Sequence, residues 1–133
     1  MLVREYRESD LDTLRRIHVA QEFPYAFPDL RDPLFLTKMV VTTGDEKILG
    51  AALLRLTAEA YLLLDPQQGS PRQRWQALLA LHSAAQFDAQ QRGLEDVHAW
   101  LPPRVAKTFG RRIERLGWRR DDEWAPYCKR FTE

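Results

Sequence analysis

The chain has 133 residues, of which 44% are hydrophobic, and a formal net charge of +1. A chain of this length buries one sizeable core, so a single domain over residues 1–133 is expected. The near-zero net charge argues against a uniformly basic nucleic-acid-binding protein, and no apolar run is long enough to predict a membrane segment.

The only cysteine, Cys128, excludes an internal disulfide and suits a reducing cytosol, so a cytoplasmic protein is expected. Because it lies in a short alternating segment, we expect a buried or half-buried structural thiol. Charge is distributed unevenly along the chain: residues 1–66 carry a net charge of −3 and residues 67–133 a net charge of +4. An anionic ligand is therefore expected to bind to the second half.

The first third of the chain predicts a strand, a helix and an irregular loop. Leu2–Tyr6 is a short β-rich run, and Ser9 with Asp12 three residues later predicts a capped helix start. The apolar positions of that helix are Leu11, Leu14, Ile17 and Val19. Residues 22–33 place three prolines among aromatic side chains, which predicts an ordered loop with apolar contacts.

Three β-rich runs follow. Phe35–Thr43 and Lys47–Thr57 flank Gly44-Asp45-Glu46, a pattern that predicts a hairpin. Ala58–Asp65 is predicted to add a third antiparallel strand to it. Within that run, Tyr61–Leu64 is continuously apolar, which is typical of a central strand buried on both faces.

A long helix is predicted after the turn that follows this strand. Ser70 is the expected cap, Pro71 the first helical residue and Gln73 the partner that completes a capping box, while Gly93 ends the helix. Apolar residues or small residues recur at helical spacing at Trp75, Leu78, Leu79, His82, Ala85 and Ala89. A turn that leads into a helix N-terminus presents backbone N–H groups, which makes it a general anion site.

The last third predicts a strand over Asp96–Leu101, a helix opened by Pro102-Pro103 and ended by Gly117, and two short strands in residues 118–131. The order β-α-β-β-β-α-β-α-β-β indicates an α/β domain. We expect a mixed, mostly antiparallel sheet with helices on both faces, because the long helix serves as a crossover between neighbouring strands.

This order, together with three local sequences, resembles the GNAT acyltransferase superfamily over nearly the whole chain. Glu46–Ala51 is similar to the family's second hairpin, Leu64-Asp65-Pro66 to the end of its fourth strand, and Glu114–Trp118 to the end of its last helix. The resemblance implies a GNAT-like fold and an N-acyltransferase that uses acetyl-CoA or another acyl-CoA. It also implies a small-molecule or peptide amine as the acceptor, with Phe23–Leu30 shaping the acceptor pocket.

In the family, the pantetheine lies between splayed fourth and fifth strands and the pyrophosphate on the turn before the long helix. The corresponding cofactor-binding positions here are Leu63, Leu64, Asp65, Gln68, Gly69, Arg72 and Arg74. The family's phosphate loop reads Gln/Arg-x-x-Gly-x-Gly/Ala, and residues 70–75 differ from it at every motif position. Phosphate binding would therefore use the backbone of Gln68 and Gly69 with the side chains of Arg72 and Arg74. The alternative is a well-capped helix with solvated arginines.

Acyl transfer to an amine requires a base for the amine and an acid for the departing thiolate. The tyrosine that often serves as the acid in the family corresponds to Ile113, which cannot transfer a proton. Glu59 lies in the region where some family members keep their base, Tyr61 shares its strand face, and His98 lies on the next strand. These three are the candidate catalytic residues. The alternatives are ordinary polar residues at a sheet edge and, for Tyr61, core packing.

Other sites are weakly indicated. His18 and His82 have no partner at metal-ligand spacing, so no metal site is predicted. A basic stripe on the last helix would suit phosphates or nucleic acid, although a solvated helix face explains it as well; the stripe comprises Arg104, Lys107, Arg111 and Arg115. Three hypotheses stay open: an acyl-CoA-dependent acyltransferase, a catalytically silent binding module of the same fold, and a nucleic-acid-associated protein using the basic helix.

Overall fold

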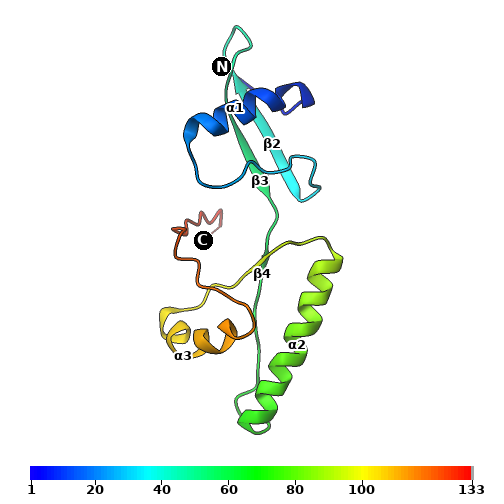
Figure 1. The fold of residues 1–133 in the computed structure, drawn as a ribbon, viewed down its shortest axis with the longest axis vertical. Helices are drawn as coiled ribbons and strands as arrows, with labels where there is room; N and C mark the ends of the chain where they lie inside the picture. Colours follow the sequence, from blue (N-terminus) through cyan, green and yellow to red (C-terminus); the bar gives the residue numbers. More distant parts are fainter. Residues whose placement is uncertain (133) are drawn as a thin grey trace. The chain divides into compact units, whose positions relative to one another are not determined.

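The structure is a computed structural model that describes residues 1–132, and Figure 1 shows its fold with the larger helices and strands labelled. The chain divides into two compact units, Met1–His98 and the part that begins at Ala99. The first unit contains all the strands and two of the α-helices, and the second contains one α-helix.

A three-stranded antiparallel sheet opens the first unit, in the order β1-β2-β3. It is formed by β1 (Leu2–Glu5), β2 (Phe35–Thr42) and β3 (Ile48–Arg55). The central strand β2 places Val41 opposite Val3 of β1 and Gly50 of β3. The predicted hairpin is confirmed, and its reversal includes Glu46 in a left-handed conformation with φ of 61°.

The first helix starts differently from the prediction. A short 3-10 helix, η1 (Glu8–Asp10), leads directly into α1 (Leu11–Gln21). The cap predicted from Ser9 and Asp12 is wrong, because the helical segment begins at Glu8 and Arg7 precedes it as the N-cap residue. The carboxylate of Asp10 reaches back and accepts the backbone N–H of Arg7 at 2.8 Å. The same carboxylate accepts two hydrogen bonds of 2.8 Å from the guanidinium of Arg4, so β1 and the start of the helix are joined by a buried ion pair.

The core of the first unit lies between α1, the loop after it and the three-stranded sheet. Leu14 of α1, Leu30 of the loop and Val40 of β2 are buried against one another. Partly buried apolar residues surround them: Tyr6, Leu11, Ile17, Phe27, Phe35, Ile48 and Leu53. The predicted proline-rich loop is confirmed as irregular, with Phe23 stacked on Tyr25 at a centroid distance of 5.6 Å.

The segment after β3 does not form the predicted antiparallel strand. β4 covers only Ala58–Glu59 and pairs in parallel with β5 (Val97–His98), forming a second, two-stranded sheet. Within the described residues, 60–65 have no ladder partner. Tyr61 is therefore 82% exposed and Leu63 89% exposed, and the prediction of a strand buried on both faces is wrong.

The long helix α2 (Pro71–Gln91) begins and ends as predicted. Ser70 caps it, with Pro71 at its first position, and Gly93 follows its end with a φ of 79°. Leu78 is buried, whereas Ala85 of the expected apolar face is exposed. The predicted strand over Asp96–Leu101 is reduced to the two residues of β5.

The second unit contains α3 (Pro103–Glu114), and Gly117 follows it with a φ of 95°. The two strands predicted in residues 118–131 are absent from the part of the chain that the structure describes. An isolated pair of short strands is marginal in water unless it adds to a larger sheet, and the second unit contains no described strand of its own. Cys128 is exposed, so the prediction of a buried thiol is also wrong.

The fold is thus mixed α/β, but with two separate sheets in place of the single mixed sheet that was predicted. None of the helices in residues 1–132 combines the length and the apolarity needed to cross a bilayer.

Candidate functional site

The parallel pair of β4 and β5 brings two of the three predicted catalytic residues together. Glu59 and His98 are direct Cα partners in the ladder, so their side chains leave the sheet on the same face. The backbone N–H of Ala60 donates to the carbonyl oxygen of His98 at 2.7 Å, and the pairing ends there. A carboxylate and an imidazole therefore stand side by side where two strands stop pairing.

Tyr61, the third predicted catalytic residue, joins this face because it lies two positions after Glu59. A hydrogen bond with the Glu59 carboxylate is the main cause that raises the pKa of Tyr61, and the negative charge of Glu59 adds to it. The phenol therefore stays protonated at neutral pH and orients the carboxylate beside it.

Asp96 and Arg55 also belong to this cluster, and the sequence analysis missed both. The carboxylate of Asp96 lies 3.7 Å from His98 Nε2 and 3.9 Å from Arg55 Nη2. Strand alternation between Asp96 and His98 was the available signal for the first contact. No comparable signal existed for Arg55, because its approach depends on how β3 leads into β4.

The turn before α2 closes on itself through the predicted capping box. Ser70 Oγ accepts the backbone N–H of Gln73 at 3.1 Å, and Gln73 Oε1 accepts the backbone N–H of Ser70 at 2.8 Å. Gly69 has a φ of 70°, and a Cβ there would lie 3.0 Å from Gln73 Oε1. Two backbone donors that would face an anion are therefore already bonded, and the turn requires glycine at position 69.

The predicted phosphate-binding residues differ in whether their side chains are already bonded within the turn. Arg74 donates to the carbonyl oxygens of Gln68 and Gly69, at 3.2 and 2.7 Å, so its guanidinium holds the turn together. Asp65 accepts the backbone N–H of Gln67 at 2.9 Å, within the same turn. Arg72 is exposed and forms no ion pair with another side chain in residues 1–132. Of this set, it is the residue whose cation is directed to solvent.

Leu63 and Leu64, the remaining predicted cofactor-binding positions, lie on the unpaired segment after β4. Leu63 is exposed and Leu64 half-buried. Their backbone N–H and C=O groups have no ladder partner in the described chain, so they are free to bond a ligand laid along the segment.

The first unit also contains a cavity of about 500 Å³ beside the proline-rich loop. Phe27, Pro28 and Leu30 line it, so part of the segment predicted to shape an acceptor pocket does border a cavity. Tyr6 lines it as well, and its buried hydroxyl has no hydrogen-bond partner among the described residues. Burial is the main cause that raises the pKa of Tyr6, so a neutral phenol is available to a small polar ligand.

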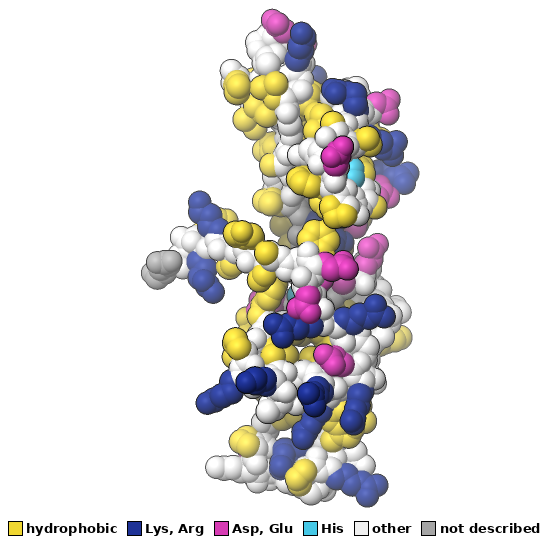
Figure 2. All heavy atoms as spheres, turned by 60° about the vertical axis from the view of Figure 1, so that its left-hand side comes forward, with side chains coloured by type: hydrophobic (Ala, Val, Ile, Leu, Met, Phe, Trp, Pro, Cys, Tyr) yellow, Lys and Arg dark blue, Asp and Glu magenta, His cyan; other side chains and the backbone are white. Residues whose placement is uncertain are grey.

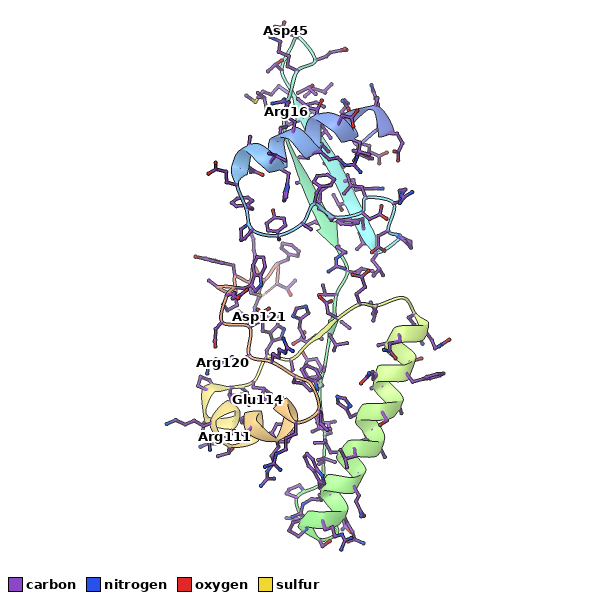
Figure 3. All side chains as sticks on the ribbon, viewed as in Figure 1. Arg16, Asp45, Arg111, Glu114, Arg120 and Asp121 are labelled. Atoms are coloured by element: carbon purple, nitrogen blue, oxygen red, sulfur yellow. The ribbon has the colours of Figure 1, made fainter. Side chains whose placement is uncertain are left out.

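The basic stripe of α3 is exposed along its length, and Arg111 projects outward from the helix in Figure 3. Glu114 projects from the same helix, so the exposed face carries both signs of charge. Within the described part of the chain, no group of three or more His, Cys, Asp or Glu side chains is arranged to hold a metal ion.

Apolar side chains are prominent on the molecular surface (Figure 2). The large exposed ones include Leu54, Tyr61, Leu63 and Phe87.

Comparisons with protein-family models, with curated proteins and with solved structures find no match for this chain.

Proposed function

We propose that this protein is an acyl-CoA-dependent N-acyltransferase with a GNAT-like arrangement, and that the face formed by Glu59, Tyr61 and His98 is its transfer site. The single observation that supports this most is the parallel pairing of β4 with β5, which ends at Glu59 and His98. A ladder that stops there leaves backbone groups of residues 61–64 without a ladder partner beside a base, as a thioester-binding slot requires.

In this proposal, Glu59 accepts the proton that an amine loses as its nitrogen attacks the thioester carbonyl. Tyr61 orients the carboxylate through the hydrogen bond that raises its own pKa. The carboxylate of Asp96 lies beside the imidazole of His98, 3.7 Å from Nε2. A thiol has a pKa of about 8.5, so the sulfur leaves as a thiolate and takes its proton from water without a dedicated acid. The position of Ile113 then needs no replacement.

The nucleotide end of the acyl donor would bind through fewer groups than a glycine-rich loop supplies. The capping box uses the N–H groups of Ser70 and Gln73, and Arg74 is bonded to carbonyl oxygens. Arg72 remains as the exposed cation at the positive end of α2. We infer that one phosphate group is held at Arg72 and at the first turn of the helix.

Binding of acetyl-CoA is the first test, because a ligand that binds only the folded state raises Tm by mass action. The purified protein should unfold at a higher temperature with acetyl-CoA than without it. Arg72→Ala should weaken that shift, whereas Arg111→Ala on α3 is the matched control and should leave it unchanged. No shift for the wild-type protein at millimolar acetyl-CoA would exclude the proposal.

Turnover is the second test, and it uses release of free thiol from acetyl-CoA in the presence of a panel of amines. Glu59→Gln keeps the size of the side chain but removes the base, so the rate should fall by roughly 10²-fold or more while the acetyl-CoA-induced Tm shift is retained. An unchanged rate in this variant would remove Glu59 from the chemistry.

A second candidate, a binding module of the same fold without transfer chemistry, is favoured by the closed capping box. A helix start whose donors are satisfied internally has less to offer a pyrophosphate. Gln73→Gly opens the box and separates the two candidates. An acyltransferase that tolerates a poor phosphate site should bind acetyl-CoA more tightly after this change, whereas a module that never bound the nucleotide should show no binding before or after it.

A further inference from the structure

The outer edge of β3 is an unprotected sheet edge. All of the ladder contacts of β3 in the described chain are with β2, so its other side presents unpaired N–H and C=O groups. β3 contains no proline, and Leu49 and Leu54 are 51% and 61% exposed. Such an edge is a template for pairing with another strand unless charge, proline or a bulge blocks it.

A free strand of matching length follows in the same chain. Residues 58–65 number eight, as does β3. Only the first two of them are paired, with β5. Beyond Glu59, the Ala60 N–H donates to His98 and the Asp65 carbonyl oxygen accepts from Gln68. The backbone groups of Tyr61, Leu62 and Leu63 have no ladder partner in the described chain, and these three side chains are exposed. One chain therefore contains two free strand edges of the kind that pair with each other.

The link between these two strands opposes their pairing within one chain. Only Leu56 and Thr57 separate β3 from β4, and the structure has no turn there. A two-residue hairpin needs positive φ at one or both central positions, which glycine and asparagine adopt and β-branched residues resist. Leu56 also continues the ladder, because its N–H donates to the carbonyl oxygen of Leu34 at 2.8 Å. The link therefore behaves as extended strand.

We propose that a second copy of this chain covers the edge, with β3 of one protomer pairing antiparallel with residues 58–65 of the other. Exchange between two copies requires no turn at Leu56-Thr57, and short hinges of this kind favour exchange. Because each copy offers one β3 edge and one free strand, a twofold axis satisfies both junctions at once.

Charge complementarity favours this occupant over a β3–β3 contact. Lys47 precedes β3 and Arg55 ends it, whereas residues 58–65 include Glu59 and Asp65. Antiparallel pairing places Arg55 near Glu59 of the partner subunit and Lys47 near Asp65 of the partner subunit. Pairing β3 with its own copy would instead bring Lys47 and Arg55 of the two copies together, which is unfavourable.

This inference goes beyond the proposed function, because the partner's β3 would pair with the edge of residues 58–65 that faces away from β5, whereas the proposed slot lies beside β5. Molar mass from light scattering during size exclusion tests it. The wild-type protein should have twice the 15.6 kDa mass of one chain. Leu56→Asn with Thr57→Gly introduces a turn that allows pairing within one chain, so this variant should have the mass of a single chain. Thr43→Asn places the same asparagine-glycine pair in the existing β2–β3 loop and should remain a dimer.

A disulfide test keeps the inference falsifiable if the hinge variant fails to fold. In a Cys128→Ser background, Ala51→Cys and Leu63→Cys lie opposite each other when Arg55 is paired with Glu59 of the partner subunit. Oxidation should give a covalent dimer on a denaturing gel. A wild-type protein of single-chain mass, or a disulfide that forms only within one chain, would overturn the proposal.

Discussion

Two parts of the first unit, residues 1–56 and residues 58–98, both contain many apolar residues but bury them to different extents. Residues 1–56 bury Leu14, Leu30 and Val40 in one cluster. Residues 58–98 bury only Leu78 among their large apolar side chains, and leave Tyr61, Leu63, Leu81 and Phe87 at least half exposed. The comparison shows that an apolar run becomes core only where a neighbouring element covers it.

The difference arises at the level of strand pairing. β2 pairs with β3 along most of its eight residues and with β1 over Met39–Thr42, and α1 approaches the sheet from one face. β4 has one partner over two residues. A strand that is paired on both edges holds its side chains in two fixed layers that a helix can cover. A strand that is paired over only two residues fixes the side chains of those two residues and leaves the side chains after them without a fixed layer.

Truncating a core leucine in residues 1–56 should give the largest loss of stability, because this is the well-packed part of the first unit. Leu14→Ala removes a side chain that is 5% exposed, so the free energy of opening β2 should fall by about 3 kcal/mol. The measurement is native-state hydrogen exchange at the Val40 amide, which reports this region separately from the others.

The matched control is Leu81→Ala on α2, because both leucines are helical and Leu81 is 50% exposed. This change should alter stability by less than about 1 kcal/mol. Equal losses for the two variants would mean that α2 is covered in solution as well as α1 is, and the contrast between the two parts would not hold.

Removing the buried carboxylate should give the next largest effect. The guanidinium of Arg4 is the main cause that holds the pKa of Asp10 at about 2, below its ordinary 3.8. The contribution to stability is fully present above pH 3.8 and is lost as the pH falls through 2. Over this shift it amounts to about 2 kcal/mol, so Asp10→Asn should reduce the unfolding free energy by about that amount at neutral pH.

Denaturant titrations across pH 2–7 provide the measurement. The difference between the wild-type protein and Asp10→Asn should shrink as the pH approaches 2. Asp29→Asn is the control: Asp29 also pairs with an arginine, Arg31, but both side chains are exposed, so its effect should be much smaller. A constant difference between wild type and Asp10→Asn at every pH would show that the ion pair does not titrate as described.

Local signals in the sequence predicted local structure well. The capping box of Ser70 and Gln73 and the terminating Gly93 fix the bounds of α2 within the helix itself. The hairpin around Gly44-Asp45-Glu46 was predictable for the same reason. Each of these features depends on residues that lie within a few positions of one another, so no distant partner has to be known.

The predictions that were wrong concern features that depend on residues far apart in the sequence. Tyr61–Leu64 has the composition of a central strand, but its burial depends on which strands flank it, and that is a matter of tertiary pairing. Ser9 is not the cap because the helical segment already begins at Glu8, and its Asp10 carboxylate is bonded to Arg4 of β1, a contact that local spacing does not reveal. At the candidate site, strand alternation placed Glu59, Tyr61 and His98 together, whereas Arg55 required knowledge of the chain path after β3.

A smaller effect should come from the cap of α2. Ser70→Ala removes the oxygen that accepts the N–H of Gln73, and the loss of such a cap costs about 1 kcal/mol. Exchange at the Leu78 amide should report it. Ser83→Ala, at an exposed position within the same helix, is the control and should be neutral or slightly stabilising. If the two variants behave alike, the capping box does not hold the helix start in solution.

The smallest effect should come from the exposed ion pair at the other end of α2. Arg92 Nε lies 3.1 Å from Asp88 Oδ2 at helical spacing, with both side chains about two-thirds exposed. Arg92→Ala should therefore cost only about 0.3–0.5 kcal/mol at low salt, and high salt should erase the difference. A cost of the size expected for Asp10→Asn would require that α2 lie against another surface in solution. The ion pair at the end of α2 would then resemble the pair of Arg4 and Asp10 between β1 and η1. The two parts of the first unit would then differ less in how they bury charged groups.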